Sequence, residues 1–352
     1  MKPPQCMATM IGSLPHKDPE RAVQLVLAHL SEAPIWPELP NRSFFEDMVH
    51  AHTAGLPGLV VDEQAHKMYI DTSLDHAAEL AGFYEKTMAA EASGDLEEFA
   101  MHSKYASAME IAALAFERAG RIYPIIKVHC IGPVSFQLGL KDAQGKALFY
   151  DETFQEVLTR QICLQARWIA RRFSGFGETT LAFLDEPSLA AFGSSSFLGV
   201  MRADVVARLG TAVAALKSEG AKVGVHVCGN TDWPMIIEAG ADLLNYDAYE
   251  YGSSMLVYAD QIGPYLERGG IIAWGIVPNN DKVRTESVQS LKDRFFSLVD
   301  GLVAAGVDRQ LVLDQSMLTP ACGLAPLSVE DAEHAIKLLA ELAASVQAIA
   351  RN

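Results

Sequence analysis

The chain has 352 residues, half of them hydrophobic, with a formal net charge of −16 and an isoelectric point near 5.0. It can bury a large core, and its acidity excludes a basic face for nucleic acid or for an anionic membrane surface. Small molecules or another protein remain as partners. The first residues lack the apolar core of a secretory signal, and no uncharged apolar stretch reaches the roughly 18 residues of a membrane span. We therefore expect a cytoplasmic protein.

Short apolar runs alternate along the chain with longer amphipathic stretches. The runs predict eight strands: Ala8–Ser13, Pro34–Trp36, Ile125–Ile131, Thr180–Asp185, Lys222–Cys228, Leu243–Asp247, Ile271–Gly275 and Leu311–Asp314. The amphipathic stretches predict helices at Asp18–Ser31, Phe154–Phe173, Met201–Ser218, Met235–Glu238, Ser287–Ala305 and Ser328–Ala350. Eight units of strand and helix predict an α/β fold, a single (β/α)₈ TIM barrel that takes up residues 1–352 as one domain.

One connection in this barrel is far longer than the others. Residues 41–120 separate the second and third strands, and about 80 residues are too many for a bare loop. We expect a helical insertion here, with Asp95–Gly120 among its helices.

Polar residues suited to a binding site follow the predicted strands directly. They are Gly12, Ser13, Glu38, Ser135, Asp185, Glu186, His226, Cys228, Asn230, Asn245, Asp247 and Cys322. Because the carboxyl ends of all strands of a barrel meet at one face, these residues are predicted to surround one pocket.

The pair His226 and Cys228 is the first sign of a metal site. Residues two apart in a strand point to the same side, so an imidazole and a thiolate can bind one ion. Zinc accepts both ligand types, and Cys322, after the eighth strand, is the natural third ligand. Asp247 or Glu250 is the candidate for the fourth position until a substrate displaces it. Bound to zinc, a substrate thiol becomes a thiolate at neutral pH.

The same residues also have a structural interpretation. Buried cysteines are common in protein cores, and a single His-x-Cys pair is a weak signal. The glycine turns that follow Cys228 and Cys322 at two strand ends favour the metal site. The other cysteines, Cys6, Cys130 and Cys163, need no functional role.

Several of these segments resemble a known family. They are Thr9–Pro15, Pro37–Pro40 with Phe45–Val49, Gly132–Ser135, Leu184–Leu189, His226–Cys228 and Pro320–Leu324. Together they resemble the catalytic barrel of cobalamin-independent methionine synthase. The chain is more distantly similar to uroporphyrinogen decarboxylase and methylcobalamin:coenzyme M methyltransferase.

The resemblance implies roles for individual residues. The segment Ile11, Gly12 and Ser13 would hold the carboxylate of homocysteine, and Glu38 and Asp185 its ammonium group. Zinc would be bound by His226, Cys228, Cys322 and, in place of the family's glutamate, Asp247.

Some of these residues also have other interpretations. A carboxylate at a strand end, such as Glu38 or Asp185, is often a helix cap or the partner of an arginine. Gly12 and Ser13 equally suit an ordinary turn. Trp274 could line the pocket, although a tryptophan in a strand more often belongs to the core.

The chain departs from the family in ways that bear on the methyl donor and the proton donor. The sequence has no second, amino-terminal barrel with basic residues for a polyglutamyl folate. The family's histidine after the seventh strand is missing, which leaves Asp281 or water as the acid, so Asp185 and Asp281 are the candidate catalytic residues. The run from His226 to Asn230 reads more like the corrinoid-dependent methyltransferases. We therefore expect methylcobalamin or a methylcorrinoid, carried by a corrinoid protein, as donor.

The leading hypothesis is a zinc-dependent thiol S-methyltransferase that converts homocysteine to methionine. One alternative is methyl transfer from a methylcorrinoid to another thiol such as coenzyme M, which has no ammonium group for Glu38 and Asp185. Uroporphyrinogen decarboxylation predicts arginines at the first two strand ends, and there are none. A non-catalytic zinc-binding barrel is a further alternative, because a fold does not determine a function.

Overall fold

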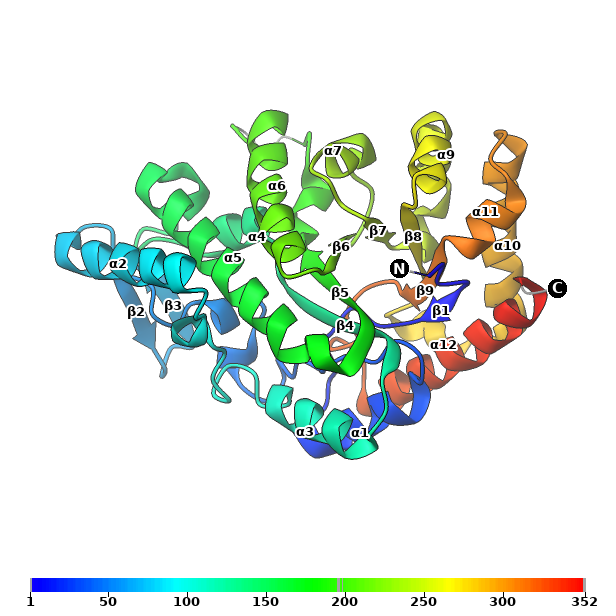
Figure 1. The fold of residues 1–352 in the computed structure, drawn as a ribbon, viewed down its shortest axis with the longest axis horizontal. Helices are drawn as coiled ribbons and strands as arrows, with labels where there is room; N and C mark the ends of the chain where they lie inside the picture. The colour runs from blue at the N-terminus through cyan, green and yellow to red at the C-terminus, as the bar shows by residue number, and fades with distance from the viewer. Residues whose placement is uncertain (1, 195–196, 198, 351–352) are drawn as a thin grey trace.

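The computed structural model describes residues 2–194, 197 and 199–350. In this part of the chain, seven parallel strands form one curved sheet in the order β1, β9, β8, β7, β6, β5, β4 (Figure 1). They are β1 (Met7–Ala8), β4 (Tyr123–Ile131), β5 (Gly177–Asp185), β6 (Lys222–Val227), β7 (Leu243–Tyr246), β8 (Ile271–Val277) and β9 (Ser316–Pro320). The predicted α/β barrel fold is confirmed.

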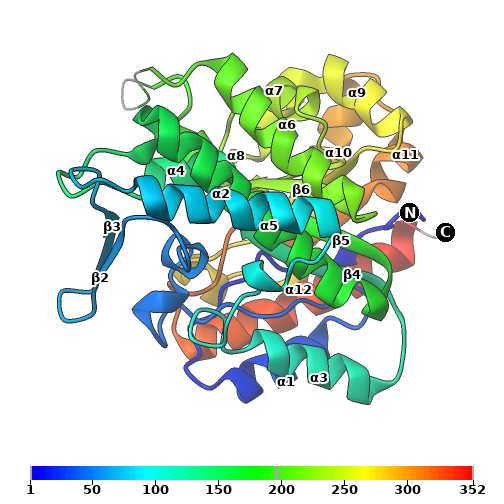
Figure 2. The same cartoon turned by 60° about the vertical axis from the view of Figure 1, so that its left-hand side comes forward.

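Helices surround the sheet on its outer side (Figures 1 and 2), and the last helix of the chain packs against β1. The α-helices are α1 (Pro19–His29), α2 (Ala77–Ser93), α3 (Met109–Ala119), α4 (Pro133–Gly139), α5 (Glu152–Phe173), α6 (Arg202–Ser218), α7 (Trp233–Glu238), α8 (Ala248–Tyr251), α9 (Ala259–Glu267), α10 (Val288–Ala304), α11 (Arg309–Asp314) and α12 (Val329–Ala350). Short 3₁₀ turns are η1 (Phe44–Glu46), η2 (His50–His52), η3 (Glu97–Phe99), η4 (Leu148–Tyr150), η5 (Ser174–Phe176), η6 (Pro187–Ala191), η8 (Gly252–Tyr258) and η9 (Asp281–Arg284). Over the described residues, no helix is both long enough and apolar enough to cross a membrane.

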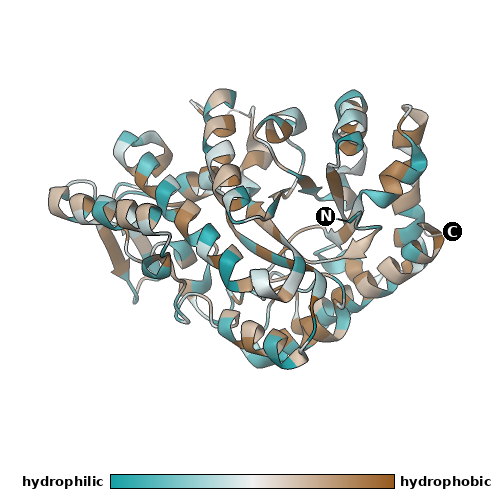
Figure 3. Ribbon diagram, viewed as in Figure 1, coloured by the Kyte–Doolittle hydropathy of each residue, from teal (hydrophilic) through white to brown (hydrophobic). Residues whose placement is uncertain are grey.

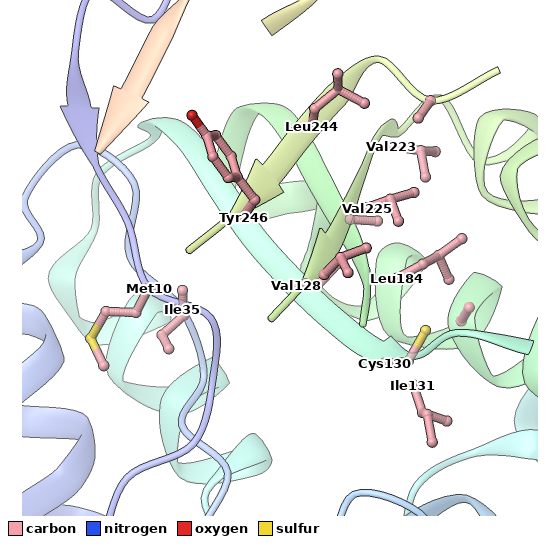
Figure 4. Close-up of a cluster of buried hydrophobic side chains, with 14 of the residues drawn as sticks. Met10, Ile35, Val128, Cys130, Ile131, Leu184, Val223, Val225, Leu244 and Tyr246 are labelled. Carbon is pink, nitrogen blue, oxygen red and sulfur yellow. The ribbon is translucent and has the colours of Figure 1, made fainter. Parts of the chain in front are cut away.

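Alternating strand residues pack on the two sides of the sheet. One buried cluster fills the barrel interior and consists of Ile11, Ala33, Ile125, Leu181, Phe183, Leu243, Ile271, Ala273 and Met317. Residues between these positions, such as Val128, Leu184 and Leu244, belong to the larger core beneath the helices (Figure 4). In Figure 3 the strands are largely hydrophobic, whereas the helices alternate hydrophobic and hydrophilic stretches. The barrel interior is therefore a packed core, and a site must lie at its end.

The predicted second strand takes its place in the barrel without becoming a regular strand. Single parallel bridges join Ile35 to Lys127 of β4 and Glu38 to Ser13, which follows β1. Pro34 and Pro37 lack the backbone N–H that a continuous ladder requires, so pairing is reduced to these isolated bridges.

The eighth strand was predicted in the wrong place. Leu311–Asp314 lies in helix α11, and the strand is β9, which starts two residues later. The side chain of Asp308 accepts a hydrogen bond from Leu311 N at 2.8 Å and caps the helix. A four-residue apolar run is too short for its periodicity to separate a helix from a strand.

The insertion between the second and third barrel positions contains α2 and α3, as well as a hairpin that was not predicted. Its strands are β2 (Leu59–Asp62) and β3 (Lys67–Ile70), which pair antiparallel. Of the predicted helix over Asp95–Gly120, only α3 is α-helical. Helix α2 lies against α5 (Figure 2), where Glu91 forms an ion pair with Arg160.

Candidate metal centre and substrate pocket

The inward side of the sheet changes from apolar to polar toward the carboxyl ends of the strands. On β5, Leu181 and Phe183 belong to the inner core, and the next inward residue is Asp185. The same alternation on β7 leads from Leu243 to Asn245. A period of two thus places a layer of polar side chains directly above the apolar one.

Three predicted metal ligands meet in this layer. His226 lies on β6, Cys228 follows that strand and Cys322 follows β9. Their donor atoms lie within 4.8 Å of one another, the only such His, Cys, Asp or Glu group of three or more among the described residues. His226 Nε2 is 3.2 Å from Cys228 Sγ and 3.4 Å from Cys322 Sγ. The structure therefore brings together residues that are 96 positions apart.

The chemistry of these donors fits a zinc ion, and their spacing is about 1 Å shorter than a tetrahedral shell requires. Zinc–sulfur bonds of about 2.3 Å put two thiolates of one tetrahedral shell roughly 3.8 Å apart. The sulfurs of Cys228 and Cys322 are 2.8 Å apart, well beyond a disulfide bond of about 2.05 Å. A separation of about 1 Å more would admit the ion. The donor set is borderline-soft and suits zinc rather than calcium or magnesium.

The hydrogen bond between the two cysteines shifts their pKa values in opposite directions. The pKa of Cys322 is lowered to about 4, above all because the Cys228 thiol donates a hydrogen bond to it, and further because His226 faces it. The same hydrogen bond, together with burial, raises the pKa of Cys228. Burial, the largest single effect, acts to lower the pKa of His226, but the charge and hydrogen bond of Cys322, the charge of Asp185 and the hydrogen bond to Asn245 together outweigh it and the pKa rises.

A cavity of about 270 Å³ opens beside the three ligands. It is lined by Ile11, Ser13, Glu38, Pro40, Glu46, Asp47, Met48, Asp185, Pro187, His226, Cys228, Asn279, Cys322, Gly323, Ala325 and Pro326. Four of these residues carry carboxyl groups, and none of the described lining residues is lysine or arginine. The cavity suits a small, positively charged ligand.

Asp185 is buried at the end of β5, and Glu38, at the bridge beside β1, is 15% exposed. Burial, and then the charge of Asp185, raise the pKa of Glu38 to about 8. Burial also raises the pKa of Asp185, whose Oδ1 atom is buried without a hydrogen-bond partner. A buried polar atom of this kind normally has a partner, so Asp185 is suited to receive a donor from a ligand.

Lys127 was not predicted as part of the site. It is fully buried on β4, donates to the carbonyl of Ile11, and its Nζ lies 4.5 Å from the centre of the Phe183 ring. Burial lowers the pKa of Lys127 to about 8, against the opposing influence of Asp185 and Glu38. Alternation along the predicted strand Ile125–Ile131 was the available signal, since it places this residue on the inward side.

The segment predicted to hold a carboxylate does border the cavity. Ile11 and Ser13 line it. Gly12 is needed because a Cβ atom there would lie 2.6 Å from Nε2 of His129. Ser13 O accepts a hydrogen bond from Leu324 N at 2.9 Å, so this segment is tied to the turn that carries Cys322.

The predicted fourth ligand is not part of the metal group. Asp247 caps α8 by accepting a hydrogen bond from Glu250 N at 2.8 Å. The alternative, Glu250, is 40% exposed and pairs with Lys282. Neither carboxylate joins the group formed by His226, Cys228 and Cys322. Asp247 is committed to the helix instead.

Two further predicted residues also lie away from the cavity. Trp274 is fully buried on the outer side of the sheet, where its indole N–H donates to Ser316 Oγ at 2.8 Å and its ring contacts Phe295. It is a core residue and does not line the pocket. Asp281 is exposed at the start of η9, and the nearby residue that lines the cavity is Asn279.

Glu186, next to Asp185, has a structural role that was not predicted. Its carboxylate accepts hydrogen bonds from Val134 N at 2.9 Å and Ser135 N at 2.7 Å, and so binds the amino end of α4. Burial raises its pKa to about 7. The two adjacent carboxylates therefore have different roles, because Asp185 faces the cavity and Glu186 binds the amino end of α4.

Comparison with known proteins gives the fold a context. No model of a protein family matches the sequence, and no curated protein matches it. A methyltransferase from Methanosarcina mazei has 16% sequence identity and a TM-score of 0.56 over 97% of this chain and 94% of its own. A Listeria monocytogenes protein, provisionally described as a vitamin-B12-independent methionine synthase, has 14% identity and a TM-score of 0.55 over 97% of each chain. The chain thus has the TIM-barrel-like fold of these two proteins.

Proposed function

We propose that the protein is a zinc-dependent methyltransferase that methylates the thiol of homocysteine to form methionine. The observation that carries this proposal is the cluster of His226, Cys228 and Cys322 at the wall of an acidic cavity. The folds of a methyltransferase and of a provisional methionine synthase support the reaction class.

His226, Cys228 and Cys322 would hold the zinc ion with three protein ligands, the number typical of catalytic zinc sites that keep one position for water or substrate. Zinc bound in this way lowers the pKa of a thiol that joins it. The cavity beside the ligands brings that thiol to the site and fixes its direction for methyl transfer.

The charges of the cavity favour an amino-acid thiol. Glu38 and Asp185 can bind an ammonium group between them, and Asp185 Oδ1 is buried without a partner. Ser13 and Gly12 would receive the carboxylate. Coenzyme M would bring a sulfonate, and uroporphyrinogen several carboxylates, into a cavity whose described lining has four carboxyl groups and no lysine or arginine.

A second cavity supports a methylcorrinoid as the methyl donor, free or carried by a corrinoid protein. It has a volume of about 430 Å³, shares Cys228 with the first cavity, and is walled by Phe192, Tyr251 and Tyr258. Aromatic walls suit a flat, conjugated donor. The described lining has no lysine or arginine to bind the tail of a polyglutamyl folate.

Metal analysis tests the site. We expect one zinc ion in each wild-type chain and a loss of most of it in Cys322→Ala. The matched control is Cys163→Ala, which removes a buried cysteine of α5 outside the metal group and should leave the zinc content unchanged. Equal zinc content in all three proteins would contradict the proposed site.

The KM values for two thiols test the contact between Asp185 and the ammonium group of the substrate. Asp185→Asn should raise KM for homocysteine about 10- to 100-fold, because a hydrogen bond to a charged group contributes roughly 1.5–3 kcal/mol. The KM for 2-mercaptoethanesulfonate, which lacks the ammonium group and whose sulfonate would face one carboxylate fewer, should not rise. A second assay tests the methyl donor. Methylcobalamin and methyltetrahydrofolate are offered separately with homocysteine, and turnover with methylcobalamin is expected. Turnover of neither donor by the zinc-loaded protein would contradict the proposal.

A further inference from the structure

Asn245 lies behind His226, on the side away from the two cysteines. It belongs to β7, is fully buried, and pairs in register with His226 on β6. Its side-chain oxygen lies 2.5 Å from Nδ1 of the imidazole. The other ring nitrogen, Nε2, faces both sulfurs.

The direction of the Asn245 amide is fixed by its other partners. Nδ2 donates to the backbone carbonyl of Ala273 at 2.8 Å and to Thr319 Oγ1 at 2.9 Å. A backbone carbonyl can only accept, so the nitrogen of the amide must face Ala273. The oxygen then faces His226, and the hydrogen between them must be carried by Nδ1.

We infer that Asn245 is a positioning residue that holds His226 with Nδ1 protonated and Nε2 free to bind the metal. This inference rests on the zinc site of the proposed function. Partners of this kind behind a histidine ligand set its tautomer and the orientation of its ring. The amide also joins β6 to β8 and β9 by hydrogen bonds, so it connects the strand of His226 to the strand that leads to Cys322.

The test is the zinc affinity of Asn245→Leu, measured by competition with a chromogenic chelator. We expect an affinity about 10- to 100-fold weaker than that of the wild type. The matched control is Ser316→Ala, which removes a buried hydroxyl that bonds Trp274 and the carbonyl of Val312 on the other side of β9. Its zinc affinity should equal that of the wild type.

A conservative variant separates positioning from general stability. Asn245→Asp keeps an oxygen for the Nδ1 hydrogen and should bind zinc within about tenfold of the wild type, more tightly than Asn245→Leu. Asn245→Ser, whose hydroxyl is too short to reach the imidazole, replaces the leucine variant if that protein does not fold. In cobalt-substituted protein, Asn245→Leu should keep the thiolate-to-metal absorption of both cysteines while the ligand-field bands shift.

The outcomes are distinct. A wild-type protein that binds no zinc contradicts the proposed function itself. A wild type that binds zinc, with Asn245→Leu and Asn245→Ser binding it equally well, overturns the inference alone. Equal losses in Asn245→Leu and Ser316→Ala also overturn it, because the effect would then follow from any lost buried hydrogen bond.

Discussion

Buried charge at the base of the cavity is the main departure from ordinary core packing. Lys127, Glu38 and Asp185 come together where the inner side of the sheet changes from apolar to polar residues. Burial of charged groups costs stability unless they are paired. Proteins break the rules of core packing mainly at functional sites, so these three side chains are candidates for a role in the cavity.

Glu38 makes stability depend on pH. Its folded pKa of about 8 lies above the ordinary value of 4.5, so its contribution to stability is fully present below pH 4.5 and is lost as the pH rises through 8. Glu38→Gln cannot ionise. We expect its free energy of unfolding to match that of the wild type at about pH 4 and to exceed it by about 1–3 kcal/mol at about pH 9.

Urea denaturation at the two pH values checks this prediction. The control is Glu117→Gln, a change at an exposed position near the end of α3, which should shift stability by no more than a few tenths of a kcal/mol at either pH. A Glu38→Gln variant that is no more stable than the wild type at pH 9 would show that the carboxyl group is not held in a costly environment.

The sequence allowed the cluster of His226, Cys228 and Cys322 to be predicted because strand ends converge in a barrel. His226, Cys228 and Cys322 needed only the positions of two strands to be placed together. Lys127 could not be assigned, since a lysine in a predicted strand is more often exposed. The position of Asp247 outside this cluster could not be predicted either, because one carboxylate at a strand end can serve a metal or cap a helix and the sequence is the same.

At the scale of elements, buried strands with long apolar runs were predicted well, and the exceptions follow from short runs and from proline. Pro34–Trp36 was recognised as a barrel segment, but Pro34 and Pro37 prevent a regular ladder. The β2–β3 hairpin was missed because it lies on the insertion, with one strand half exposed, and its alternation is weak.

Gly132, just before α4, lies close to Glu186, just after β5, and the effect of this contact on stability can be tested. A Cβ atom on Gly132 would lie 2.3 Å from the carboxyl carbon of Glu186, which binds the first amides of α4. Gly132→Ala should therefore lower the free energy of unfolding by about 1–3 kcal/mol. The matched change Gly82→Ala lies in open space inside α2 and should raise it by about 0.5–1 kcal/mol.

Thermal and chemical denaturation of the two alanine variants measure this difference. Opposite signs are expected for the same chemical change, because one glycine is required by a close approach and the other is not. If Gly132→Ala were as stable as the wild type, the carboxylate of Glu186 would have to move without loss, and its role in holding α4 would be wrong.

For the whole molecule, zinc should couple to folding. An ion that binds only the native state stabilises it by about 2.7 kcal/mol at a concentration 100 times Kd. We expect zinc to raise Tm of the metal-free wild type by about 3 °C or more and to leave Cys322→Ala unchanged. Magnesium is the control for unspecific binding, because the net charge of −16 attracts any divalent cation. Equal shifts with both metals would indicate such unspecific binding.

The closure of the barrel has a mechanical consequence. Residues 34–38 are joined to their neighbours by isolated bridges, whereas β6, which carries His226, lies within regular ladders. The wall of the cavity therefore has less regular pairing at Glu38 than at His226. If a ligand widens this wall, we expect the change at Glu38, and the proposed metal donor His226 would then keep its place.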